Sequence, residues 1–211
     1  MLVHGLWYGP AAMWPLAHAL RQHGCSVSRF NYASVSRPWQ DNVADLCQHL
    51  RSCPAAQVQI IAHSLGGLLA LSALAESESA SSDRQVTQLM LLGTPLQGSA
   101  IAARLRQNAM TSRLLGHSGS VLVQGLAELV PQVAANCRLV MIAGCRPLGL
   151  GKILVSMQGE HDGTVAVSET RHPDLHAHHC IPCGHSGLLL AARVRQTVIT
   201  ELFSAGHCHW I

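Results

Sequence analysis

Short apolar segments rich in Val, Ile and Leu alternate with amphipathic segments along the whole chain. This pattern is typical of an α/β protein, in which helices cover both faces of a parallel sheet. Several apolar segments lack polar alternation, as expected of strands buried on both sides. We therefore predict a mostly parallel sheet of about six strands, at Leu2–His4, Ser26–Tyr32, Gln57–His63, Gln88–Gly93, Arg138–Ala143 and His178–Pro182.

Helical periodicity lies between these strands and after the last one. The predicted helices are Ala11–His23, a helix opened by Ser36 and Pro38, an apolar helix directly after Ser64, and Gly187–Phe203. In the last of these, the residues spaced to face the sheet are Leu189, Val194, Val198 and Leu202.

One segment, Ser99–Cys137, is about twice as long as an ordinary crossover. Its second half places apolar residues on one helical face, namely Leu122, Leu126, Leu129 and Val133. We interpret 99–137 as a helical, cap-like or lid-like insertion in a single domain that spans residues 1–211. The amphipathic stretch Val121–Val133 either covers a pocket as a lid or completes the core, and both interpretations stay open.

Composition narrows the possible classes of protein. Hydrophobic residues make up 48% and charged residues 12% of the chain, which excludes a disordered protein. The net charge is +3 without a basic cluster and aromatic residues make up 4%, so we expect no nucleic-acid partner. The eight cysteines are dispersed, which favours reduced thiols. Without a signal-peptide pattern or an apolar run of about 20 residues, we expect a cytoplasmic protein.

The strongest chemical signal is Ala62–Gly67, with the sequence AHSLGG, where a predicted strand turns into a helix. A serine at such a turn has a strained backbone and an exposed hydroxyl, and it needs small neighbours where helix and strand approach. Gly66 is one such neighbour. We therefore predict that Ser64 is a nucleophile, whereas the similar Gly116–Ser120, which follows no strand, is predicted to be a loop.

A serine hydroxyl becomes nucleophilic when a histidine takes its proton, and an acid must orient that histidine. After a strand-to-helix serine, the acid precedes the histidine in the chain, and each lies in a loop that follows a strand. His185 lies between the last predicted strand and the last helix, and it is the predicted base. Asp162, followed by Gly163, is the predicted acid, and Glu160 and Asp174 are the competing carboxylates.

The negative oxygen formed during acyl transfer needs preorganised backbone N–H donors. The predicted donors are Leu65, at the start of the helix after the nucleophile, and Leu6, in the loop after the first strand. We expect an acyl chain to contact Trp7, Tyr8 and apolar residues of the insertion.

With these motifs, the chain resembles the α/β-hydrolase superfamily, and within it small bacterial lipases and esterases and the lipase-like enzymes named after GPI inositol-deacylase. Nearly the whole chain takes part in the resemblance, which implies a sheet that lacks the first strands of the full fold. Leu96 stands where some of these lipases have a histidine. The similar segments are Val3–Trp7, Ala62–Gly67, Gly93–Ser99, Asp162–Val165 and Gly184–Leu189.

The resemblance implies a serine hydrolase that cleaves carboxylic esters through an acyl-serine intermediate and needs no cofactor. It implies a small-molecule acyl ester or a lipid as substrate, and it allows a transient contact with a membrane or lipid interface. Thioesterases and acyltransferases use the same triad, and the sequence does not separate them. A non-catalytic binding member of the fold is a further alternative.

A metal-binding or redox module is an alternative from another class. It would be built from His172, His176, His178, His179, Cys180, Cys183 and His185. The CxxC spacing fits, but no second pair of ligands completes a zinc site, and alternate strand residues face opposite sides. We therefore predict no metal, and we interpret His207–His209 as a terminal tail.

Overall fold

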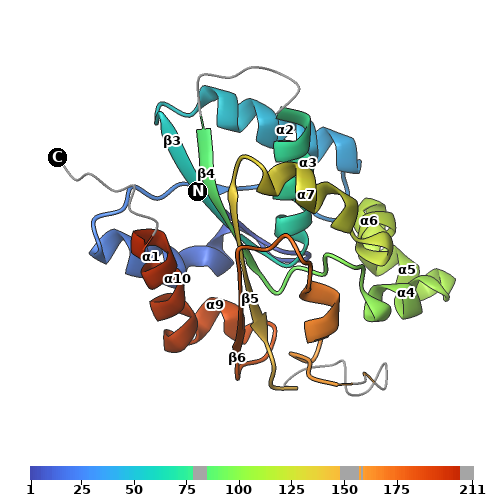
Figure 1. The fold of residues 1–211 in the computed structure, drawn as a ribbon. Helices are drawn as coiled ribbons and strands as arrows, with labels where there is room; N and C mark the ends of the chain where they lie inside the picture. Colours follow the sequence, from blue (N-terminus) through green and yellow to red (C-terminus); the bar gives the residue numbers. More distant parts are fainter. Residues whose placement is uncertain (78–84, 148–156, 158, 205–211) are drawn as a thin grey trace.

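A computed structural model describes residues 1–77, 85–147, 157 and 159–204. It confirms the predicted α/β class, with one sheet in the order β2-β1-β3-β4-β5-β6 and parallel pairing throughout (Figure 1). The carboxyl ends of all these strands therefore meet at one edge of the sheet. The strands are β1 (Leu2–Val3), β2 (Arg29–Phe30), β3 (Gln57–His63), β4 (Gln85–Leu92), β5 (Arg138–Gly144) and β6 (Ala177–Ile181), and each overlaps a predicted strand.

Helices cover both faces of the sheet (Figure 1). One face packs against α2 (Trp39–Ser52), α3 (Leu65–Ser77) and α7 (Val130–Ala134). The other packs against α1 (Trp14–Gln22), α9 (Gly187–Leu190) and α10 (Ala192–Ser204). The helices between β4 and α7 are α4 (Ala100–Arg106), α5 (Ala109–Leu115) and α6 (Gly119–Gln124), and the short 3-10 helices are η1 (Pro10–Met13), η2 (Gly116–Ser118), η3 (Ala127–Leu129) and η4 (Val167–Thr170).

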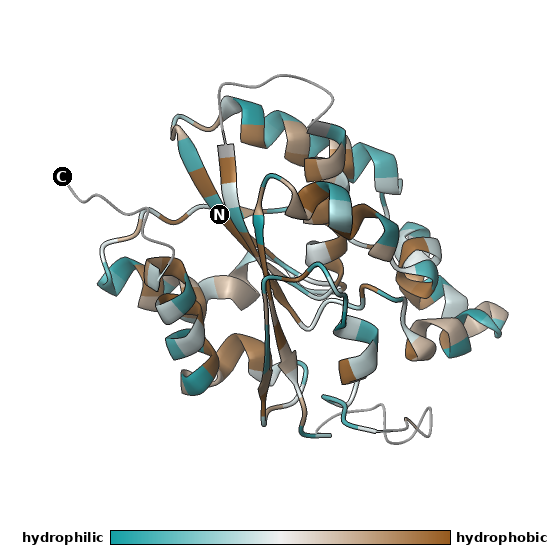
Figure 2. Ribbon diagram, in the orientation of Figure 1, coloured by the Kyte–Doolittle hydropathy of each residue, from teal (hydrophilic) through white to brown (hydrophobic). Residues whose placement is uncertain are grey.

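Alternate residues of the central strands supply the two halves of the core. In β4, Leu89 and Leu91 pack toward the α2 and α3 side, whereas Met90 and Leu92 pack toward α1 and α10, and all four side chains are fully buried. Burial of each such side chain stabilises the fold by about 1.5–3 kcal/mol. Figure 2 shows the apolar residues gathered on these strands, as the unbroken apolar runs predict.

The prediction of a single helix over Gly187–Phe203 is wrong. The chain forms α9 and α10, separated at Ala191, where φ is −69° and ψ is 132°. The break lets both helices pack on the same face of the sheet, since Leu188 and Leu189 of α9 join Val198 of α10 in one buried cluster.

Two predictions for the segment 99–137 are also wrong. Gly116–Ser120 is helical rather than a loop, because η2 leads directly into α6. The stretch Val121–Val133 is not one helix, because the chain turns at Gly125, where φ is 72°. The turn is held from outside the segment, since the N–H of Leu126 donates to the carbonyl oxygen of Leu96 at 2.9 Å.

Gly66, in the first turn of α3, lies against the chain that follows β1. A Cβ atom at this position would be 2.3 Å from the carbonyl oxygen of His4. We expect Gly66→Ala to lower the free energy of unfolding by about 3 kcal/mol, because backbone on both sides would have to move. Gly9→Ala is the matched control, since a Cβ there meets nothing within 4 Å. Urea unfolding measures both variants, and equal transition midpoints would contradict this close approach.

No helix in the described part of the chain has the length and apolarity needed to cross a membrane.

Candidate active site

Ser64 forms the turn between β3 and α3. Its φ angle is 54°, and among the described residues only Ser64 and Trp7 have a positive φ without being glycine. Such a conformation costs about 1–3 kcal/mol. Hydrogen bonds hold it in place: the N–H of Ser64 donates to the carbonyl oxygen of Leu92 at 2.9 Å, and Thr94 Oγ1 donates to the carbonyl oxygen of Ser64 at 3.1 Å. The strained strand-to-helix turn expected from the sequence is present.

The structure brings Ser64, His185 and Asp162 together at the carboxyl ends of the strands. Ser64 Oγ is 2.9 Å from Nε2 of His185, and Nδ1 of His185 is 2.7 Å from Oδ2 of Asp162. A carboxylate only accepts hydrogen bonds, so Nδ1 carries the proton and Nε2 can accept from the serine hydroxyl. This is the tautomer that a general base requires.

The loop that carries Asp162 fixes the direction of its carboxylate. Oδ1 accepts from the N–H groups of Thr164 at 2.9 Å and Val165 at 2.7 Å, which leaves Oδ2 for the histidine. The N–H of His185 also donates to the carbonyl oxygen of Asp162 at 2.9 Å, so the two loops are joined twice. The competing carboxylates, Glu160 and Asp174, are exposed and do not contact His185.

The predicted oxyanion donors are Leu65, next to the nucleophile in the chain, and Leu6, which lines the same cavity as Ser64. Leu65 is the first residue of α3, and N–H groups at a helix start lack acceptors within the helix. Leu6 precedes Trp7, whose positive φ bends the loop and whose N–H donates to Ser34 Oγ at 3.2 Å. Their role as oxyanion donors stays a prediction.

A cavity of about 470 Å³ opens beside Ser64 and His185. Trp7 and Tyr8, the predicted substrate contacts, lie on its wall together with Leu6. Thr164 and Ser186 add hydroxyl groups at its more exposed part. The apolar part of the lining comes from the segment 99–137, through Ile101, Ala102, Leu105, Leu115 and Leu122. A reacting carbonyl at Ser64 would therefore have an apolar surface next to it.

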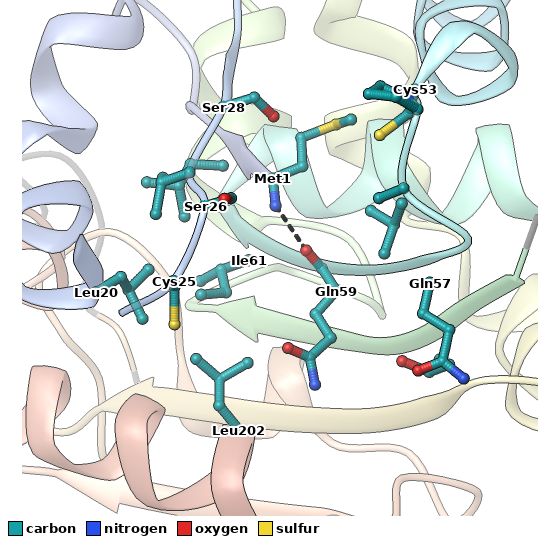
Figure 3. Close-up of a pocket in the computed structure, with 16 residues that line it drawn as sticks. Met1, Leu20, Cys25, Ser26, Ser28, Cys53, Gln57, Gln59, Ile61 and Leu202 are labelled. Atoms are coloured by element: carbon teal, nitrogen blue, oxygen red, sulfur yellow. Dashed lines mark hydrogen bonds between the residues drawn. The ribbon is translucent and has the colours of Figure 1, made fainter. Parts of the chain in front are cut away.

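A second cavity, of about 520 Å³, lies at the opposite end of the sheet, by the amino end of β3 (Figure 3). The amino group of Met1 donates there to the carbonyl oxygen of Gln59 at 2.7 Å. Cys25 and Cys53 line this cavity, but no histidine, aspartate or glutamate from the described residues does. This cavity holds instead the Met1 amino group, whose pKa is lowered by burial to about 6, whereas the cavity at Ser64 holds a serine hydroxyl hydrogen-bonded to a histidine.

Glu169 is a site residue that sequence reasoning missed. Its Oε1 accepts from the N–H of Ala100 at 2.7 Å, and its Oε2 accepts from the N–H of Ala166 at 2.9 Å. Burial raises the pKa of Glu169, the two N–H donors oppose this effect, and the nearby Asp162 adds to it. Glu169 thus ties the start of α4, on the apolar wall, to the loop of the proposed acid.

Two histidines of the metal-binding alternative are hydrogen-bonded to residues outside the proposed ligand set. His178 Nε2 is 2.9 Å from Thr170 Oγ1, and His179 Nε2 is 2.7 Å from Glu201 Oε1. Among the residues that the structure describes, no three His, Cys, Asp or Glu side chains form a group that could hold a metal ion. The tail His207–His209 lies outside the described residues.

Comparison with known proteins adds one family. The model of the family described as "Domain of unknown function (DUF7379)" matches residues 4–145. The matched range includes Ser64 and ends before Asp162 and His185. No curated protein matches the chain.

Solved structures establish the α/β-hydrolase fold. Lipase BlEst2 of Bacillus licheniformis in its mature form has a TM-score of 0.79 and 22% identity, over 95% of this chain and 89% of that one. The propeptide form of that lipase has a TM-score of 0.77 and 22% identity, over 94% of this chain and 49% of that one. A methylesterase from Arabidopsis has a TM-score of 0.60 and 14% identity, over 97% of each chain.

Proposed function

The chain belongs to the family described as a domain of unknown function (DUF7379), and we propose that it is a serine hydrolase that cleaves carboxylic esters. The observation that carries this proposal is the continuous contact from Ser64 Oγ through the His185 ring to Asp162, at 2.9 Å and 2.7 Å. The fold shared with a lipase and a methylesterase supports the same class of reaction. Since a fold hosts many chemistries, the proposal depends on the site.

In the first half of the reaction, Ser64 Oγ attacks the carbonyl carbon of the ester while its proton passes to Nε2 of His185. Asp162 stabilises the imidazolium that forms. The backbone N–H groups of Leu6 and Leu65 donate to the negative carbonyl oxygen of the tetrahedral intermediate. The C–O bond to the alcohol then breaks, the alcohol leaves with the proton from Nε2, and the acyl group stays on Ser64.

In the second half, water replaces the alcohol. His185 takes one proton from water, and the oxygen of that water attacks the acyl carbon. The same backbone N–H groups stabilise the negative oxygen of the second intermediate. Collapse of this intermediate returns the proton to Ser64 Oγ and releases the carboxylic acid. Ser64, His185 and Asp162 all return to their starting protonation states, and the reaction consumes only the ester and one water molecule, so it needs no cofactor.

The apolar wall of the cavity supports an aliphatic or aromatic acyl group as the part of the substrate bound beside Ser64. Trp7 and Tyr8 would contact the same substrate from the oxyanion loop. A lid movement of 99–137, a transient contact with a lipid surface and a cytoplasmic location are further parts of the proposal. Resemblance to the GPI inositol-deacylase group depends on sequence motifs alone, so we propose a simple ester and not an inositol lipid.

A panel of p-nitrophenyl esters of increasing acyl length tests this function. We expect hydrolysis well above the spontaneous rate, with kcat/KM rising as the acyl chain covers the apolar wall, since each buried CH₂ contributes about 0.8 kcal/mol. Thioesters and alcohol acceptors in the same assay separate thioester hydrolysis and acyl transfer from ester hydrolysis. Folded protein that hydrolyses none of these substrates would contradict the proposal.

A further inference from the structure

His63 directly precedes Ser64, is fully buried, and has no part in the proton transfer described above. Its Nε2 is 3.2 Å from the backbone carbonyl oxygen of His185. The two imidazole rings also contact each other, with centroids 4.7 Å apart and an angle of 45° between their planes. The residue before the proposed nucleophile therefore contacts both the backbone and the ring of the proposed base.

The hydrogen bond fixes the tautomer of His63. A carbonyl oxygen only accepts, so Nε2 donates and Nδ1 carries the lone pair. Nδ1 has no hydrogen-bond partner in the described part of the chain, and it is pressed against Gly5, where a Cβ would be 2.8 Å away. A buried polar atom without a partner destabilises a fold and needs an explanation.

His63 is also held in its neutral form. Burial, and then the charge of the nearby His185, keep the pKa of His63 well below 6.5. A neutral ring donates one hydrogen bond without placing a positive charge beside His185 when that residue takes the proton of Ser64. A lysine or arginine could donate the same bond, but its charge would oppose formation of the imidazolium.

Tyr8 supports the same loop from the other side. Its ring meets His63 edge-on, at 5.6 Å between centroids and 74°, and its hydroxyl is 2.7 Å from Ser186 Oγ. His63 and Tyr8 therefore hold two consecutive residues, His185 and Ser186. His63 contacts the backbone oxygen of His185, and Tyr8 contacts the hydroxyl of Ser186 at the cavity.

We propose that His63 is a positioning residue, whose Nε2–H bond to the carbonyl oxygen of His185 keeps that imidazole in line between Ser64 and Asp162. This inference rests on the proposed function, because it assigns His63 a task in that reaction. A displacement of the imidazole by about 1 Å is enough to slow a reaction about 100-fold. Its alternative is that His63 only fills space in the core.

The pair His63→Gln and His63→Met separates the two roles. The side chains are similar in size, but the glutamine amide offers an N–H near the position of Nε2 and methionine offers none. We expect His63→Met to lower kcat about 100-fold with KM within about threefold, and His63→Gln to recover most of that loss. His18→Met, on the exposed side of α1, is the control and should match wild type.

A proton NMR measurement gives a readout that does not need activity. The Nδ1 proton that His185 shares with Asp162 should give a low-field resonance in wild type and His63→Gln, and the resonance should broaden or vanish in His63→Met. His63→Leu, which also lacks an N–H donor, provides a second variant if His63→Met does not fold, and Tyr8→Phe tests the neighbouring bond to Ser186 by removing only a hydroxyl. We expect its kcat to fall about three- to tenfold through loss of the bond to Ser186.

Wild-type kcat and a normal resonance in folded His63→Met would overturn the positioning role. Equal losses in the glutamine and methionine variants, with the resonance kept in both, would do so as well, because they indicate space filling. A wild-type protein that does not react with a fluorophosphonate would instead contradict the proposed function, and the resonance would still test the role of His63.

Discussion

Ser64→Ala is expected to lower kcat for ester hydrolysis by about 10⁶-fold, leaving only the residual rate that binding and the backbone donors supply. The substitution removes the oxygen that attacks the carbonyl carbon and leaves the cavity and the backbone donors in place. Alanine at position 64 would keep the backbone hydrogen bonds to Leu92 and Thr94, so the fold should be retained. Initial rates with the best ester of the panel measure the loss.

Ser120→Ala is the matched control for this substitution. Ser120 lies in the look-alike peptide Gly116–Ser120, and its side chain is exposed on α6. We expect this variant to keep wild-type activity. Activity retained in Ser64→Ala would show that another residue is the nucleophile.

Asp162→Asn is expected to lower kcat by about 10⁴-fold with little change in stability. The N–H groups of Thr164 and Val165 both donate to Oδ1, so the asparagine oxygen must take that position. Its NH₂ group then faces His185, and Nδ1 must accept, which moves the ring proton to Nε2. A protonated Nε2 cannot take the proton of Ser64. Steady-state kinetics with a saturating ester measures this effect.

The competing carboxylates provide matched controls for Asp162. Glu160→Gln and Asp174→Asn each remove a charge from an exposed position. Both should keep kcat within about twofold of wild type, since exposed charges are largely screened. A loss in either variant that equals the loss in Asp162→Asn would assign the acid to that residue instead.

The strands could be predicted from the sequence because the pattern that marks each strand lies within its own residues. A run such as Leu139–Ala143 is apolar throughout, and no contact with a distant residue is needed to mark it as a buried strand. The helix breaks could not be predicted in this way. Gly125 turns against the backbone of Leu96 and Gly98, and Ala191 is extended so that α9 and α10 pack on one face. Both depend on neighbours that are distant in the chain or on other elements.

The proposed triad could be predicted for a similar reason. Ser64, Asp162 and His185 each follow a strand or lie near its end, and parallel strands bring such loops to one edge of the sheet. The contact of His63 with His185 joins residues 122 positions apart. The bonds from Glu169 to Ala100 and Ala166 likewise depend on how the loops meet, and no spacing rule marks them.

Mapping of a fluorophosphonate adduct by peptide mass spectrometry tests the central claim most directly. The reagent reacts with a serine only when a neighbouring base takes its proton, so the label reports the nucleophile itself. We expect one adduct, on Ser64, that forms in the wild-type protein and is absent in Ser64→Ala and strongly slowed in Asp162→Asn. A folded wild-type protein without an adduct, or with its adduct on another serine, would contradict the assignment of Ser64, His185 and Asp162 as a catalytic triad.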